Sequence, residues 1–414
     1  MSLEEKKRLQ QALSLSSERI FDLQRSMTAL HGLGPDNGGE GEQAKADYLE
    51  AWLRSFGVNG IEHADAADTR IPSGKRPNLL VKIPGRTKKM LWILGHMDVV
   101  PAGEEKLWRT DPWTVSRDEN DHDLIHGRGV EDNQQAIACG CVLAAAIKEQ
   151  GIVPDRGLGL ILVSDEETGN RYGIQHVFQE YPNFISGEDM VVVPDSGSAD
   201  GTFIETAEKG ILWLRVEIEG CQCHASKPDD GKNALVAASA MILGVKDVEE
   251  RFSERDALFS PERSTFTPTK HEANVPNVNT MSGKETFYID CRVLPCYALD
   301  EVLSAFRELA AAVEKKYDVS IKVCKAMEEP AAAPTPEESA VVQKLKKAVY
   351  EVLGRECRCG GIGGSTVAVS FRERGIPAAV WAMIFENCHS PNEAARLSFA
   401  VKESQVFASM LFDD

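Results

Sequence analysis

The stretch Met90–Asp98, Met-Leu-Trp-Ile-Leu-Gly-His-Met-Asp, limits the possible folds more than any other part of the chain. Met90–Leu94 is a continuous apolar run, which is typical of a strand buried on both faces of a parallel sheet covered by helices. Gly95 ends the run, and His96 and Asp98 follow it. Because ligands of open α/β sheets bind beyond the carboxyl ends of strands, these two side chains mark a candidate site. The alternative is a solvated strand end without a function.

The order of segments predicts an α/β fold with a doubly wound, mostly parallel sheet. Short buried runs alternate with segments of helical periodicity, the arrangement of strands joined by helices. We predict strands at Asn78–Ile83, Met90–Leu94, Leu158–Val163 and Met190–Val193, and helices at residues 4–31, Glu40–Phe56 and Asn133–Gln150. The same alternation resumes late in the chain, at Glu337–Leu353, Ser365–Arg374, Ile376–Trp381 and Asn392–Leu411.

From Gly210 the apolar pattern changes to alternation with polar residues, which predicts a half-exposed antiparallel strand. We expect Gly210–Gly220 to form a sheet edge that could pair with a second copy of the chain. A helix (Asn233–Phe252), a strand ending at Arg292, a helix (Leu299–Tyr317) and a strand (Ser320–Val323) follow. Since 414 residues exceed the usual size of one core, we predict two domains. They are residues 1–209 with 327–414, and an inserted α+β domain of residues 210–326.

Charge and hydropathy exclude several classes of partner. The net charge of −18 argues against nucleic acid and anionic membranes as partners. No apolar run approaches the roughly 20 residues of a membrane span. The first residues lack the apolar core and cleavage signal of a secretory peptide, so we expect a cytoplasmic location.

Ten cysteines include three Cys-x-Cys pairs: Cys139 and Cys141, Cys221 and Cys223, and Cys357 and Cys359. This spacing differs from the Cys-x-x-Cys of zinc ribbons and redox motifs. In a cytosolic chain we therefore expect buried free thiols. A cysteine-based metal or redox function is the alternative.

Acidic and imidazole side chains follow four predicted strand ends. They are His96 with Asp98, Asp132, Glu166 with Glu167, and Asp195, and His389 lies just before the last predicted helix. If the sheet brings them together, the negative charges repel unless protons or a cation offset them. A mixed histidine and carboxylate set suits zinc, with manganese or cobalt as substitutes. One tetrahedral ion needs fewer ligands, so we predict two ions bridged by one carboxylate.

Five stretches, in order, resemble the di-zinc metallopeptidase and amidohydrolase family of aminoacylase, acetylornithine deacetylase, succinyl-diaminopimelate desuccinylase, glutamate carboxypeptidase and bacterial dipeptidases. The stretches are Gly95–Asp98, Gly127–Asp132, Asp165–Gly169, Pro194–Asp195 and His389. The resemblance implies a metal-binding, phosphorylase/hydrolase-like catalytic domain at residues 1–209 and 327–414. It also implies a ferredoxin-like lid at residues 210–326, two Zn²⁺ per subunit (Co²⁺ or Mn²⁺ as substitutes), and a homodimer formed through the lid.

The same resemblance implies the metal ligands. Asp132 would bridge the two ions. His96 and Asp195 would complete one site, and Glu167 and His389 the other. All five residues are present in this chain.

Three further residues match positions that take part in catalysis in the family. Glu166 would be the general base on the attacking water, and Asp98 would orient His96. Two neighbouring glutamates cannot reach the same ion from one strand end, which also favours one ligand and one base. His224, in Gly220–Pro228, resembles the histidine that reaches a neighbouring subunit's site and stabilises the oxyanion.

Substrate contacts are implied in the same way. Arg292 and Asn279 match family positions near the substrate. Gly363, Gly364 and Ser365 belong to a glycine-rich turn that resembles the one beside the substrate carboxylate.

We therefore expect a di-zinc hydrolase that cleaves amide bonds of dipeptides or N-acyl amino acids. An aspartate at position 195 resembles the aminoacylases and dipeptidases, whereas a glutamate at this position would resemble the desuccinylases and carboxypeptidases. Asn133-Gln134-Gln135 departs from the Met-Lys-Gly of many relatives. One alternative is a biosynthetic deacylase such as succinyl-diaminopimelate desuccinylase or acetylornithine deacetylase. A catalytically silent metal-binding relative is another.

Overall fold

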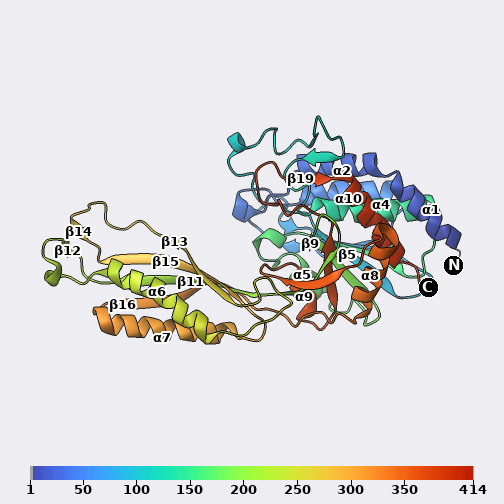
Figure 1. Ribbon diagram of the computed structural model, residues 1–414. Helices are drawn as coiled ribbons and strands as arrows, with labels where there is room; N and C mark the ends of the chain where they lie inside the picture. The colour runs from blue at the N-terminus through green and yellow to red at the C-terminus, as the bar shows by residue number, and fades with distance from the viewer. Residues whose placement is uncertain (1–2, 414) are drawn as a thin grey trace. The chain divides into compact units, whose positions relative to one another are not determined.

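The structure, a computed structural model, describes residues 3–413 and divides into two compact units (Figure 1). The larger unit holds the chain up to Thr206, Thr335–Cys359, and the chain from Thr366 onward. The smaller unit holds Ala207–Pro334 and Gly360–Ser365. The predicted ranges did not include this return of residues 360–365 to the inserted unit. The catalytic and lid roles of the two ranges stay predictions.

An eight-stranded mixed sheet forms the centre of the larger unit. Its order is β1 (Ile61–His63), β4 (Leu79–Ile83), β8 (Gly157–Val163), β5 (Met90–His96), β9 (Met190–Gly197), β18 (Ala378–Ala382), β10 (Phe203–Glu208) and β17 (Arg358–Ile362). Strands β8, β5, β9 and β18 are parallel, while β1, β4 and β10 pair antiparallel with their neighbours. The predicted α/β class is confirmed, and the parallel pairing is confined to the middle of the sheet.

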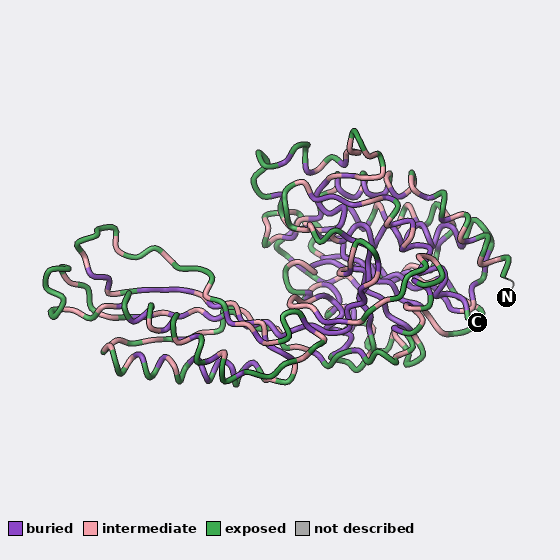
Figure 2. Tube along the Cα trace, viewed as in Figure 1, coloured by how far each residue is buried: buried purple, intermediate pink, exposed green. Residues whose placement is uncertain are grey.

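Helices cover both faces of this sheet (Figure 1), and its central strands are buried (Figure 2), as the continuous apolar runs predict. In β5, Leu91 and Ile93 point into one core and Trp92 and Leu94 into the other. The first core is completed by α1 (Leu3–Ser14), α2 (Ser17–Ala29), α3 (Gln43–Ser55), α4 (Gln134–Glu149), α8 (Ala340–Leu353) and α10 (Leu397–Met410). The second is completed by α5 (Ile174–Glu180) and α9 (Ala368–Arg372). Within residues 3–413, no helix combines the length and apolar character that a membrane crossing requires.

Two small sheets flank the main one in the larger unit. They are β6 (Ser116–Arg117), β7 (Leu124–His126) and β19 (Ala394–Arg396), and the pair β2 (Ala66–Ala67) and β3 (Lys75–Arg76). Asp132 lies between β7 and α4, so the strand that precedes it belongs to a small sheet and not to the main one. The glycines at Gly127 and Gly129 form a turn there, and a turn gives no apolar run that could reveal it.

The smaller unit is a four-stranded antiparallel sheet with two helices on one face. Its strands lie in the order β13 (Thr265–His271), β15 (Lys284–Val293), β11 (Gly210–Glu219) and β16 (Ser320–Glu329). The helices are α6 (Ala234–Arg251) and α7 (Leu299–Tyr317), and β12 (Cys223–His224) pairs with β14 (Thr280–Met281). The chain order β11-α6-β13-β15-α7-β16 is the predicted ferredoxin-like topology.

Strand β11 is an inner strand, so the prediction that Gly210–Gly220 forms an edge is wrong. It pairs with β15 on one side and β16 on the other. Its alternation has another cause: the helices cover one face of the sheet, burying Leu212, while Trp213 on the other face is 41% exposed. The edges of this sheet are β13 and β16.

All ten cysteines are free thiols, as predicted, but only Cys139, Cys141 and Cys291 are fully buried. The Cys139 sulfur donates to the Ala400 carbonyl (3.2 Å) and to a carboxylate oxygen of Glu403 (3.1 Å). This pairing places Glu403 at the centre of a small buried polar network.

Glu403 of α10 is completely buried. One carboxylate oxygen accepts hydrogen bonds from the Met383 N–H (2.6 Å) and the Gln135 amide (2.7 Å). Burial raises the pKa of Glu403 to about 7, although these hydrogen bonds and that of Cys139 oppose the shift and the charge of Glu131 adds to it.

We expect Glu403→Gln to flatten the pH dependence of stability. The folded wild type retains a proton that the unfolded chain releases above about pH 4.5, so its free energy of unfolding falls as the pH rises from about 4.5 to about 7 and levels off above that. Relative to wild type, the variant should therefore gain on the order of 3 kcal/mol between pH 4.5 and 8. Urea unfolding of both proteins across this range measures the difference. Groups that titrate independently of Glu403 contribute equally to both proteins, and parallel curves would contradict the expectation.

Candidate metal centre

His96, the last residue of β5, is held at the carboxyl edge of the sheet with both ring nitrogens engaged. It is 1% exposed. Its Nδ1 lies 3.0 Å from the Asp98 carbonyl oxygen, and its Nε2 lies 2.9 Å from Asp132 Oδ1 and 3.7 Å from Asp195 Oδ1. A hydrogen bond from Nδ1–H to the carbonyl leaves Nε2 as the free ligand atom.

Asp132 lies between two imidazoles and presents a different oxygen to each. Oδ1 is 2.9 Å from His96 Nε2, and Oδ2 is 3.1 Å from His389 Nε2. His389 Nε2 also lies 3.1 Å from Glu167 Oε1. The structure therefore brings all five predicted ligands together, with Asp132 in the middle.

Glu166 and Glu167 lie on a short turn after β8 that Asp98 fixes. The two carboxylate oxygens of Asp98 accept the backbone N–H groups of Glu166 and Glu167, each at 3.0 Å. The same carboxylate lies 3.5 Å from His96 Nδ1, farther than the Asp98 carbonyl. Asp98 thus contacts both strand ends, and its orienting role towards His96 stays a prediction.

Two buried glutamates that the sequence analysis gave no role support the ligands Asp132 and His389. Glu393 accepts the N–H groups of Gly129 (2.9 Å), Glu131 (2.9 Å) and Asp132 (3.1 Å) and pairs with Arg128 Nη1 (2.7 Å).

Glu131 in turn accepts the N–H groups of Phe385 (2.8 Å) and Asn387 (2.9 Å). These bonds tie the turn before α4 to the loop that carries His389, whose φ is +61°. Glu131 lies inside the stretch Gly127–Asp132, which resembles the family, and Glu393 follows His389, but their sequence spacing gives no sign of the contact.

Lys45 supports the chain beside Asp98, and the sequence analysis gave it no role. The amine of Lys45 is buried and donates to the carbonyls of Met97 (2.6 Å) and His31 (3.0 Å). Burial lowers its pKa to about 8, against the opposing charges of Asp98 and Glu42. Lys45 therefore fixes the carbonyl group of Met97, the residue between His96 and Asp98.

Asn133, which directly follows Asp132, links two strand ends. Its Oδ1 accepts the His96 N–H (3.2 Å), and its amide donates to the Pro194 carbonyl and to Asp195 Oδ1, both at 2.7 Å. The sequence marked this residue as a departure, and the structure gives it a contact with two predicted ligands.

The charges of the cluster fit a bound cation. Burial raises the pKa of Glu166 well above its ordinary value; His96 opposes this shift, and the charges of Asp195, Glu167 and Asp98 add to it. Burial likewise raises the pKa of Glu167 to about 7. Carboxylates this close repel unless protons or a cation offset them.

The donor atoms fit the same conclusion. Three groups each place their ligand atoms within 4.8 Å of one another: His96 with Asp132 and Glu167, His96 with Glu166 and Asp195, and Asp132 with Cys388 and His389. Imidazole and carboxylate donors at such distances suit zinc and its substitutes.

The remaining predicted residues lie in the smaller unit, in two groups at opposite ends of β15. His224 pairs with Thr280 and its Nδ1 lies 2.7 Å from Ser226 Oγ, while the Asn279 carbonyl accepts the Ala225 N–H (2.9 Å).

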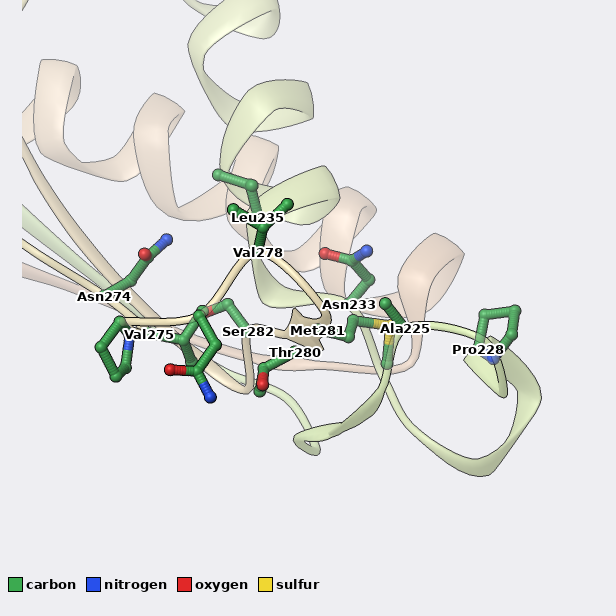
Figure 3. Close-up of a pocket in the computed structure, with 12 residues that line it drawn as sticks. Ala225, Pro228, Asn233, Leu235, Asn274, Val275, Val278, Thr280, Met281 and Ser282 are labelled. Carbon is green, nitrogen blue, oxygen red and sulfur yellow. The ribbon is translucent and has the colours of Figure 1, made fainter.

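Beside the first group is a cavity of about 410 Å³ lined in part by Thr280, Leu235 and the fully exposed Val278 (Figure 3). The strand from Lys284 to Arg292 separates this end from the other by roughly 25 Å.

In the second group, Arg292 donates to Asp290 (2.7 and 3.0 Å) and to the Gly363 carbonyl (2.9 Å). Ser365 donates to Glu329 (3.0 Å), and a Cβ at Gly364 would meet only the tip of Ile362. Arg292 and the glycine-rich turn are thus neighbours, as the predicted substrate contacts require, whereas Asn279 belongs with His224.

Comparison with known proteins adds independent evidence. The sequence profile of peptidase family M20/M25/M40 matches residues 92–413. An uncharacterized metallohydrolase of Methanocaldococcus jannaschii is 36% identical over 409 residues, which cover 95% of this chain and 99% of that protein. A succinyl-diaminopimelate desuccinylase of a Sulfurovum species is 24% identical over 392 residues, covering 94% and 97%. A solved dipeptidase of Saccharomyces cerevisiae has the same fold, with a TM-score of 0.76 at 16% identity over 98% of both chains.

The resemblance seen in the five motifs is confirmed by these matches, which extend over nearly the whole chain. The clustered imidazole and carboxylate groups agree with the metal dependence that the name metallohydrolase describes. The protein is a metal-dependent hydrolase of amide bonds, and its chain belongs to peptidase family M20/M25/M40.

Proposed function

We propose that this hydrolase holds two Zn²⁺ ions per subunit, with Co²⁺ or Mn²⁺ as substitutes, and cleaves dipeptides or N-acyl amino acids. The observation that carries the proposal is the position of Asp132, whose two oxygens lie 2.9 and 3.1 Å from two different imidazoles. A carboxylate in this position can bridge two ions. His96 and Asp195 would hold one ion, and Glu167 and His389 the other.

In the proposed mechanism, the bound ions would polarise the substrate carbonyl and lower the pKa of a water molecule. Glu166 takes the proton of the attacking water on a carboxylate oxygen and passes it to the leaving nitrogen. Asp98 keeps Glu166 in place through the backbone N–H that it accepts. His224 donates a hydrogen bond to the developing oxyanion.

The free carboxylate of the substrate would bind Arg292 and the turn Gly363–Ser365. Support comes from the 2.9 Å contact between Arg292 and the Gly363 carbonyl, which fixes the guanidinium beside the turn. Asp290 already accepts two hydrogen bonds from Arg292, so a substrate carboxylate would compete with it. Asn279 would assist from the end of the unit that carries His224.

A dedicated biosynthetic deacylase is the second candidate. The Sulfurovum desuccinylase supports it through its 24% identity over 94% of this chain. Asp195 and the yeast dipeptidase support the dipeptide and N-acyl amino acid proposal instead. A catalytically silent relative is disfavoured because all five ligand positions and the base are present.

The test is metal analysis followed by a substrate panel with and without chelator. We expect two metal ions per chain and hydrolysis of dipeptides or N-acyl amino acids. Chelation should abolish turnover and lower the melting temperature, because ions that bind the crowded carboxylates stabilise the folded state. Added Zn²⁺, Co²⁺ or Mn²⁺ should restore both. One ion per chain would contradict the two-ion centre, and a preference for succinylated substrates would select the deacylase.

We further propose a homodimer, located in the cytoplasm, in which the smaller unit brings His224 to the partner's metal centre. His224 is exposed, and the nearby Val278 and Leu235 expose apolar surface of the kind that protein interfaces bury. The available sheet edges are β13 and β16.

Mixing two inactive variants tests the shared site. His224→Ala and Glu166→Gln should each be nearly inactive, whereas their mixed dimers regain one intact site that combines His224 of one chain with Glu166 of the other. The measurement is turnover after the two variants are unfolded and refolded together. A mixture of His96→Ala and Glu166→Gln is the matched control, because both changes fall in the same cluster. No recovery despite verified subunit exchange would contradict the shared site.

A further inference from the structure

Cys388 precedes the predicted ligand His389 and presents its sulfur to the same cluster. The ligand atoms of Asp132, Cys388 and His389 all lie within 4.8 Å of one another. In a tetrahedral zinc site, with bonds of about 2.0–2.3 Å, neighbouring ligand atoms lie roughly 3.5 Å apart. A small side-chain shift would therefore place all three on one ion.

The loop that carries Cys388 is anchored on both sides. The N–H groups of Phe385 and Asn387 bind the buried carboxylate of Glu131, and the Asn387 side chain accepts the Ala394 N–H (3.1 Å). Left-handed backbone at Glu386 and His389 turns the chain within this short span. The position of the sulfur is thus fixed by the surrounding structure.

The sulfur of Cys388 is not engaged by any hydrogen-bond partner among the described residues. Within residues 3–413, Cys388 Sγ takes part in no hydrogen bond. By contrast, the buried sulfur of Cys139 donates to Ala400 and Glu403. Cys388 is half-buried, and its sulfur lies within 4.8 Å of a ligand atom of His389 and of Asp132. These are the surroundings of a metal ligand.

We propose that Cys388 is a thiolate ligand of the ion on the His389 side of the centre, an inference that rests on the proposed two-ion function. With Asp132, Glu167 and His389 it gives this ion four protein ligands, the number found in closed zinc sites. The His96 side keeps three, Asp132, Asp195 and His96, and so retains an open position for water or substrate. The two sites therefore differ in chemistry: sulfur favours Zn²⁺ and Co²⁺ over Mn²⁺ on the His389 side.

Cobalt substitution tests the ligand directly. The metal-free protein is titrated with Co²⁺, and the near-ultraviolet absorption is recorded together with the number of ions bound per chain. We expect a thiolate-to-cobalt charge-transfer band in the wild type and in Cys296→Ser, which changes an exposed thiol of the smaller unit. Cys388→Ser should lose the band and bind Zn²⁺ at one site at least about tenfold more weakly, with Mn²⁺ binding unchanged.

The outcomes separate this inference from the proposed function. Two bound Co²⁺ without the band would overturn the role of Cys388 and leave the two-ion centre intact. Fewer than two bound ions in the wild type would contradict the two-ion proposal itself.

A second measurement covers the case in which Cys388→Ser fails to fold. In the wild type, alkylation followed by peptide mass spectrometry compares Cys388 with and without Zn²⁺. Protection of Cys388 by Zn²⁺ but not by Mn²⁺ is expected for a ligand, and equal reactivity would overturn the inference.

Discussion

Glu166→Gln is expected to lower kcat at least about a thousandfold while both metal ions remain bound. The amide cannot accept the proton of the attacking water, yet it fills the same volume and can keep the backbone hydrogen bond from Glu166 N–H to Asp98. KM should change little, because the substrate contacts assigned to Arg292 and the glycine-rich turn lie elsewhere. Steady-state kinetics combined with metal analysis measures both effects.

Glu167→Gln is the matched control on the same turn. Its carboxylate lies 3.1 Å from His389, so this variant should lose metal, whereas Glu166→Gln should not. The reverse result would exchange the two roles. Full activity in Glu166→Gln would remove it from the mechanism.

Glu393→Ala should destabilise the protein strongly and deplete it of metal. The change leaves Arg128 as a buried charge without its carboxylate and removes the acceptor of three backbone N–H groups around Asp132. Loss of one member of a buried ion pair costs about 3–5 kcal/mol. Urea unfolding of the metal-free proteins measures this cost separately from the loss of metal.

Two further variants show whether the cost comes from these contacts. Glu356→Ala changes an exposed glutamate without an ion pair in residues 3–413, and it should shift stability by less than about 0.5 kcal/mol. Arg128→Met combined with Glu393→Gln removes the charge of both partners, so it should recover part of the loss. Equal stability of Glu393→Ala and wild type would contradict the support that we assign to Glu393.

The central strands could be predicted because a strand that is buried on both faces has a continuous run of apolar residues. Met90–Leu94 and Leu158–Val163 are apolar at every position, and polar residues begin where each strand ends. The same local signal identified His96 and the Glu166–Glu167 pair. Asp132 and His389 lie on irregular segments that no apolar run marks. They were candidates only as an acidic and an imidazole side chain, and the family resemblance supplied their roles as ligands.

The supporting residues could not be predicted, since their roles depend on contacts between distant segments. Glu393 binds the backbone of residues 129–132, and Lys45 binds the carbonyl of Met97. Nothing in the residues near Lys45 or Glu393 distinguishes them from exposed charges. The wrong prediction that β11 is an edge strand has a related origin. Alternation of apolar and polar residues indicates that one face of the strand is exposed to solvent, but it carries no information on whether other strands pair on either side.

The bonds between Glu393 and the turn before α4 join segments more than 260 residues apart in sequence. His389 and Glu393 follow the other cluster residues in the sequence, and a chain is synthesised from its amino terminus. During translation, the strands that carry His96, Glu167 and Asp195 are thus available long before the segment that completes the cluster. Until that segment leaves the ribosome, the early carboxylates face one another without the imidazole of His389 or the anchoring carboxylate of Glu393. Tight metal capture therefore requires the segment that carries His389 and Glu393.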